Sequence, residues 1–213
     1  MDRVRGANLT YLGLPALVDL ERCVREAPAG DLIECGVALG GSGIVLASLV
    51  AEGQQFHGYD VFGMIPSPGP EDPPEVHDRY QVIAAGESDG IGGHTYYGYR
   101  DNLYSEVAEN FAAHGHPVDG LRVQLHRGLF QDMLGPERPV AVAHLDCDWY
   151  EAVALCLARI RPFVVPGGFV VCDDYYDWGG AMKAVDEFTE VNADFTPADF
   201  GTGHLILRRD SGG

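Results

Sequence analysis

Residues 31–51, DLIECGVALGGSGIVLASLVA, contain the pattern that decides the fold. The short apolar run 31–37 predicts a buried strand, and the apolar run 42–51 predicts a helix with Ser42 as its N-cap. Glycines between the two runs allow a tight turn and a close approach of the backbone to a ligand. A strand, a glycine-rich turn and a helix in this order are typical of α/β proteins.

The rest of the chain continues this alternation, which predicts an α/β fold in a single domain of 213 residues. Residues 1–30 are expected to be helical, with a helix over 9–25 interrupted near Pro15. The segment 63–98 is rich in proline and glycine, and we interpret it as a substrate lid with a helix within 75–85. The other expected helices and strands are helices at 99–114, 150–160 and 180–191, strands at 55–61, 121–126, 140–145 and 168–172, and a closing antiparallel pair at 195–200 and 204–208.

Charge and hydropathy exclude several classes of protein. Lys and Arg number 14 against 32 Asp and Glu, for a net charge of -18, which would repel nucleic acid. The first twenty residues lack the apolar stretch of a secretory signal, and no apolar run approaches the roughly 20 residues of a membrane span. The five cysteines form no CxxC pair and are expected to be buried thiols. These features predict a cytoplasmic protein without nucleic-acid or membrane partners.

The glycine-rich turn predicts a nucleoside site. Its spacing, G-x-x-x-G-G from Gly36, differs from the G-x-G-x-x-G of dinucleotide folds, and an acid at Glu34 suits a cationic ligand. S-adenosylmethionine has such charges. Asp60, some twenty residues beyond the turn at the end of the second strand, is placed to accept hydrogen bonds from a ribose. The predicted cofactor-binding residues are Glu34, Gly36, Gly40, Ser42 and Asp60, with Gly128 and Phe130 on the adenine side.

Acidic residues end two consecutive buried strands, in LDCDWY (145–150) and VCDDYY (171–176). If these strands are neighbours, Asp146 converges with Asp173 and Asp174 at the carboxyl edge of the sheet. A divalent cation that prefers oxygen ligands, Mg²⁺ above all, would relieve the repulsion among the three carboxylates. The alternative is that each acid caps the element that follows it.

Several stretches together carry a family resemblance: GDLIECGVALGGS (30–42), YDVF (59–62), HRGLFQDML (126–134), LDCDWYE (145–151), PGGFVVCDDY (166–175) and KAVDEF (183–188). From 31 to 208 the chain resembles the macrocin O-methyltransferase (TylF-like) family, which comprises metal-dependent class I methyltransferases that methylate deoxysugar hydroxyls in antibiotic biosynthesis. The resemblance implies a Rossmann-like sheet of seven strands in the order 3-2-1-4-5-7-6, mostly parallel, with helices on both faces. It also implies Mg²⁺ on Asp146, Asp173 and Asp174, Asp146 as the general base, a glycosylated small-molecule acceptor and a homo-oligomer.

Other residues near the predicted site have open roles. Asp148 and His144 are further candidates for the base, although His144 also fits a buried histidine that only supports its neighbours. Tyr96, Tyr97, Tyr150 and Tyr175 are predicted to contact the acceptor. A catechol-type O-methyltransferase, an NAD-dependent oxidoreductase and a non-catalytic α/β module remain as alternative functions.

Overall fold

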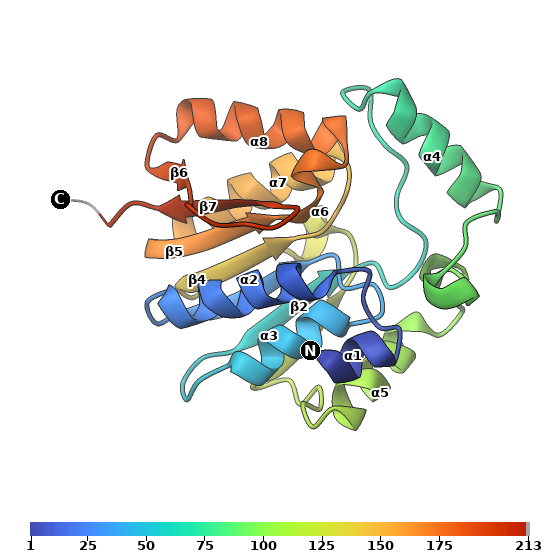
Figure 1. The fold of residues 1–213 in the computed structure, drawn as a ribbon, viewed down its shortest axis with the longest axis horizontal. Coiled ribbons are helices and arrows are strands. Elements are labelled where there is room, and N and C mark those ends of the chain that lie inside the picture. The colour runs from blue at the N-terminus through green and yellow to red at the C-terminus, as the bar shows by residue number, and fades with distance from the viewer. Residues whose placement is uncertain (212–213) are drawn as a thin grey trace.

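The computed structural model describes residues 1–211 and contains one seven-stranded sheet in the order β3-β2-β1-β4-β5-β7-β6 (Figure 1). The expected strand order is therefore confirmed. The five strands β3, β2, β1, β4 and β5 are parallel to one another, whereas β7 pairs antiparallel with both β5 and β6. The strands are β1 (Asp31–Cys35), β2 (Phe56–Asp60), β3 (Val123–Arg127), β4 (Val140–Leu145), β5 (Val164–Cys172), β6 (Phe195–Pro197) and β7 (Leu205–Arg209).

Helices cover both faces of the sheet and enclose two cores. One core contains apolar side chains of α2, α3 and α5, and the other contains those of α7 and α8 (Figure 1). All five cysteines are buried free thiols, as expected. The helices are α1 (Asp2–Gly6), α2 (Leu14–Glu26), α3 (Gly41–Leu49), α4 (Pro74–Ala84), α5 (Leu103–Ala113), α6 (Phe130–Met133), α7 (Tyr150–Ile160) and α8 (Gly179–Val191).

The central strands bring the candidate residues to one edge of the sheet. Every residue of β1 and β4 is buried, as expected of parallel strands covered on both faces. Leu145 of β4 pairs with Cys172 of β5, so the two strands end level with each other. The acids that follow them therefore begin side by side.

Two expected helix boundaries are wrong for backbone reasons. Ser42 is not an N-cap, because Gly40 takes that position with φ 91° and ψ 6° and α3 already includes Gly41. Pro15 does not interrupt a helix but lies in the first turn of α2, where its missing N–H has no partner to lose.

The segment 63–98 is folded rather than an open loop. It contains α4 and two 3₁₀ turns, at Ile91–Gly93 and Tyr97–Tyr99, and Figure 1 shows α4 beyond the carboxyl ends of the strands. Two hydrogen bonds tie it to the region where α7 begins: Trp149 Nε1–H donates to the Pro66 carbonyl (2.9 Å), and Tyr150 N–H donates to Asp72 Oδ1 (2.8 Å). The segment thus has a fixed position over the carboxyl edge.

Among residues 1–211, no helix combines the length and the apolar character that a bilayer crossing requires.

Candidate active site

Two cavities lie side by side at the carboxyl edge of the sheet, with volumes of about 480 Å³ and about 600 Å³. We call them the first and the second cavity. Gly36, Asp60, Tyr97 and Asp146 line both of them. The two cavities therefore share a wall that includes Asp146.

The first cavity lies over the ends of β1, β2 and β3. Gly36 comes from the turn after β1, and Gly128 and Phe130 come from the segment after β3. These three predicted cofactor residues share one cavity wall with Asp60. Gly40 is the N-cap of α3, and Ser42 is buried within that helix; neither is among the residues lining the cavity.

Asp60 holds the glycine-rich turn through the backbone. Its Oδ2 accepts hydrogen bonds from the N–H groups of Val37 (2.8 Å) and Ala38 (3.0 Å), and its Oδ1 accepts one from Phe62 (2.6 Å). Burial raises the pKa of Asp60, although these three donors act in the opposite direction. The carboxylate thus shapes the turn as well as facing the cavity.

The Glu34 side chain is out of reach of a cationic ligand in either cavity. It is fully buried under α3, where a Cβ on Gly43 would lie 2.5 Å from Glu34 Oε2, and it lines neither cavity. Glu34 Oε1 instead lies 3.0 Å from Nδ1 of His144, its neighbour across β1 and β4. Glu34 is therefore the partner of a buried histidine.

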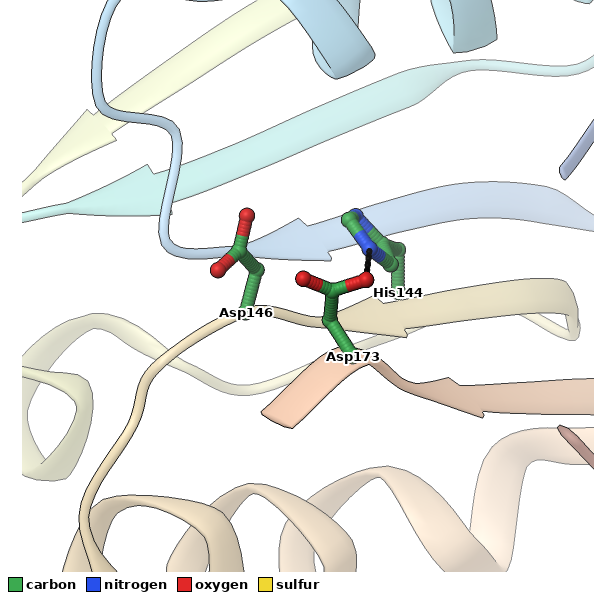
Figure 2. A group of neighbouring side chains, drawn as sticks. All are labelled: His144, Asp146 and Asp173. Carbon is green, nitrogen blue, oxygen red and sulfur yellow. Dashed lines mark ion pairs between the residues drawn. The ribbon is translucent and has the colours of Figure 1, made fainter. Parts of the chain in front are cut away.

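Two of the three acids expected to converge after β4 and β5, Asp146 and Asp173, lie close together, and the third member of their group is His144 rather than Asp174. One donor atom each from His144, Asp146 and Asp173 lie within 4.8 Å of one another (Figure 2). The distance from His144 Nε2 to Asp173 Oδ1 is 3.9 Å. Asp174 lines the second cavity with Asp146 and Asp173, and its Oδ2 accepts a hydrogen bond from the N–H of Asp148 (3.0 Å).

Asp148 has an unusual backbone. Its φ is 59°, in the left-handed region that non-glycine residues rarely adopt and that costs of the order of 1–3 kcal/mol. The Asp174 carboxylate bonds to its N–H, and the Asp148 residue itself lines both cavities. The surrounding structure thus holds this acid at the junction of the cavities.

Buried carboxylates crowd together at this edge of the sheet. Burial raises the pKa of Asp146 and of Asp174, and neighbouring carboxylates, Asp173 and Asp148 respectively, raise it further. Burial and then Asp173 raise the pKa of Asp148 to about 6. Buried carboxylates this close together, with the pKa raised at Asp146, Asp148 and Asp174, suit a divalent cation among their oxygens, so the residues that are present fit such an ion.

Asp173 behaves differently because two histidines face it. Burial alone would raise its pKa, but His144 and His204 hold it below its usual range. The sequence reasoning missed His204, which precedes β7 and contacts both Asp173 and Asp19 of α2. The sequence contained one signal for it. A strand that pairs antiparallel with β5, as β7 does, places its first residues, and the residue before them, beside the end of β5.

The four tyrosines separate into two pairs. Tyr96 and Tyr97 line the second cavity together with Trp149. Trp178, which sequence reasoning did not assign to the site, lines it as well. Tyr150 and Tyr175 line neither cavity. Their hydroxyls lie on the outer surface of α8, where they donate to Glu187 (2.6 Å) and Asp186 (2.8 Å), respectively.

Known proteins resemble this chain over most of its length. A curated relative is the 8-demethyl-8-(2,3-dimethoxy-alpha-L-rhamnosyl)-tetracenomycin-C 4'-O-methyltransferase of Streptomyces olivaceus, which is 30% identical over 199 residues, covering 86% of this chain and 72% of the relative. The demethyldecarbamoylnovobiocin O-methyltransferase of Streptomyces niveus is 28% identical over 195 residues, covering 84% of this chain and 67% of the relative. The solved structure of the O-methyltransferase NovP shares the fold, with a TM-score of 0.78 at 23% identity, covering 99% of this chain and 88% of that chain.

The model of the macrocin-O-methyltransferase (TylF) family matches residues 7–199. A methyltransferase of this family implies S-adenosylmethionine as the methyl donor. Since the match includes the first cavity, all of the second except Thr202 and Gly203, and every strand except β7, the chain is a methyltransferase and belongs to the macrocin-O-methyltransferase (TylF) family.

Proposed function

We propose that the protein is a Mg²⁺-dependent O-methyltransferase that transfers the methyl group of S-adenosylmethionine to a sugar hydroxyl of a glycosylated natural product. One observation carries the proposal: the two cavities meet at Asp146, within a cluster of buried carboxylates. This arrangement suits a donor in one cavity, an acceptor in the other and a base between them.

The first cavity suits the methyl donor. Gly36 allows a ligand to approach the backbone closely, and Asp60 offers carboxylate oxygens to a ribose at the end of β2. Gly128 and Phe130 form the wall after β3, where an adenine would fit. S-adenosylmethionine bound here supplies an electrophilic methyl group.

Asp146 and Asp173 would hold the cation, with Asp174 as the third carboxylate of the second cavity. A bound divalent cation would lower the pKa of an acceptor hydroxyl and neutralise the carboxylates around it. Asp146, in the wall of both cavities, is placed to take the proton of that hydroxyl. The shared wall also sets the orientation of donor and acceptor, which contributes to the rate.

The second cavity suits a sugar acceptor. Tyr96, Tyr97, Trp149 and Trp178 provide aromatic faces on which a sugar ring can pack, and carboxylates provide acceptors for its hydroxyls. The name of the Streptomyces olivaceus relative specifies methylation on a rhamnosyl-bearing tetracenomycin. That relative supports a glycosylated antibiotic as the acceptor of this chain.

Methyl transfer to matched acceptors tests the proposal. Chelator-treated enzyme is assayed with a rhamnosylated polyketide, its aglycone and a simple catechol, with and without added Mg²⁺. We expect transfer to the glycoside only, at least 100-fold slower without Mg²⁺, while calorimetry shows unchanged S-adenosylmethionine binding.

Variants of the acids complete this experiment. Asp173→Asn should remove the Mg²⁺-dependent activity, whereas the control Asp199→Asn, at a side chain that is 92% exposed, should not change it. Full turnover after chelation would contradict the metal role, and turnover of catechol without turnover of the glycoside would contradict the sugar acceptor.

A further inference from the structure

His204 is a buried histidine between two carboxylates. His204 directly precedes β7 and is 2% exposed. Nδ1 lies 3.4 Å from Asp173 Oδ1, and Nε2 lies 3.4 Å from Asp19 Oδ2. Both contacts are ion-pair distances rather than hydrogen bonds, and neither ring nitrogen has a hydrogen-bond partner within the part of the chain that the structure describes. The two carboxylates are therefore the groups that orient this ring.

On its far side, His204 is connected to the wall of the second cavity. Asp19 of α2, which faces Nε2, also accepts a hydrogen bond from the N–H of Thr202 (2.7 Å). Thr202 and Gly203 line the second cavity, and so does Ala16 from the same helix as Asp19. Asp19 thus joins α2, the turn before β7 and the imidazole of His204.

On its near side, His204 acts on one oxygen of Asp173. His144 faces the same oxygen, Oδ1, from β4 at 3.9 Å. Figure 2 shows the other oxygen of Asp173 turned toward Asp146. Groups that hold one oxygen of a ligating carboxylate fix the direction of the other, and their loss typically weakens metal binding 10–100-fold.

We propose that His204 is a positioning residue for the divalent cation of this enzyme: it holds Asp173 Oδ1 so that the second oxygen of Asp173 faces Asp146. The inference rests on the proposed metal dependence and adds a residue outside the carboxylate cluster.

Two amide substitutions separate the two contacts of the ring. The amide nitrogen of asparagine lies where Nδ1 of histidine lies, so His204→Asn keeps a donor toward Asp173. The amide nitrogen of glutamine lies where Nε2 lies, so His204→Gln keeps a donor toward Asp19 and loses the one toward Asp173. Both variants are neutral and retain a polar group at the buried position.

The measurement is Mn²⁺ binding to the metal-free protein by electron paramagnetic resonance, without donor or acceptor, alongside thermal unfolding without metal. We expect His204→Gln to weaken Mn²⁺ binding about 10-fold with its melting temperature close to that of the wild type. His204→Asn should bind Mn²⁺ within about 3-fold of the wild type. A role in folding alone would change the melting temperature and leave the affinity of the folded protein unchanged.

The outcomes distinguish this inference from the proposed function. Wild-type affinity in His204→Gln, or a 10-fold loss in His204→Asn, would overturn the role of His204 and leave the metal site in place. If the wild type itself did not bind Mn²⁺, the metal part of the proposed function and this inference would both be wrong. Should His204→Gln not fold, the affinity of His204→Asn still tests the contact with Asp173.

Discussion

Gly36 lies directly against the backbone of Asp146: a Cβ added to Gly36 would be 1.7 Å from the Asp146 carbonyl oxygen. Asp146 N–H donates to Cys35 O (2.9 Å), which ties the two segments together, and Gly36 N–H donates to Tyr59 O (2.9 Å) on the β2 side. The turn that borders the first cavity and the candidate base therefore share a contact that has no room for a side chain.

We predict that Gly36→Ala disrupts the site. The methyl group must displace the backbone after β4, and φ of Gly36 is +93°, which is unfavourable for alanine. The expected loss is at least 3 kcal/mol of folding free energy, or an insoluble protein, and more than 10-fold weaker S-adenosylmethionine binding. Chemical unfolding and calorimetry measure these effects.

Gly53→Ala is the matched control for the steric part. Gly53 has φ +81°, but a Cβ there would meet no atom within 4 Å. It should lose about 1–2 kcal/mol from backbone strain alone and keep its affinity for the methyl donor. Equal losses in the two variants would show that the contact with Asp146 is unimportant.

Asp72 anchors the segment 63–98, and we predict that Asp72→Ala loosens it. The side chain is buried and accepts hydrogen bonds from Tyr150 N–H (2.8 Å), in the first turn of α7, and from Gly69 N–H (2.9 Å). Loss of this cap should cost about 1–2 kcal/mol and expose the segment to proteolysis. Limited trypsin digestion and urea unfolding check both effects.

The neighbouring Glu71→Ala provides the control for this change. Glu71 forms an exposed ion pair with Lys183 of α8, and such pairs contribute little to stability. Its unfolding and cleavage should match the wild type within error. Unchanged proteolysis of Asp72→Ala would contradict an anchoring role.

Tyrosine substitutions should separate the residues that line the second cavity from those that do not. Tyr150→Phe and Tyr175→Phe lose only hydroxyls that bond to the outer surface of α8, so kcat/KM should stay within about 2-fold of the wild type. Tyr97 lines both cavities, and Tyr97→Ala should raise KM for the acceptor at least 10-fold, which corresponds to about 1.4 kcal/mol. Steady-state kinetics at saturating donor check this order. A large loss of kcat/KM in Tyr150→Phe would instead indicate that the Tyr150 hydroxyl contacts the acceptor.

The sequence predicted the convergence of Asp146 and Asp173 because the strands before them are mostly apolar and the family resemblance implies that they are neighbours, so that both end at one edge of the sheet. It could not predict the surroundings of Glu34, because they depend on Gly43 leaving room under α3. The role of His204 depends on the pairing of β7 with the end of β5, where Cys172 pairs with Leu205.

Tyr150 and Tyr175 show a similar limit. Both directly follow the acidic motifs, which suggested the acceptor site. Tyr150 begins α7 and Tyr175 lies in the 3₁₀ turn Asp173–Tyr176. In these positions both side chains point toward α8 instead. The direction of a side chain in the first turn after a strand depends on tertiary packing, which neither hydrophobic periodicity nor motif spacing specifies.

A histidine pair on neighbouring strands lies apart from both cavities. His57 of β2 and His126 of β3 stack with ring centroids 5.4 Å apart, and His57 Nδ1 lies 3.1 Å from His126 Nε2. Burial lowers the pKa of both imidazoles, and for His126 the neighbouring His57 lowers it further. For His57, Asp31 raises the pKa and Arg138 lowers it, after the larger effect of burial.

We predict that this pair makes the protein less stable in mild acid. The folded pKa of each histidine is lower than the unfolded value of about 6.5. Below pH 6.5 the unfolded chain therefore binds more protons than the folded protein does. The free energy of unfolding consequently falls as the pH drops from 6.5 through the folded pKa values of His57 and His126. His57→Gln removes one titrating group and the repulsion between two imidazolium ions. Its melting temperature should therefore fall less than that of the wild type between pH 7.5 and pH 5.5. Each 1 kcal/mol of unfolding free energy corresponds to a shift of about 2–4 °C in melting temperature. The exposed His94→Gln should follow the wild type, and a wild-type pH dependence in His57→Gln would show that other groups control acid stability.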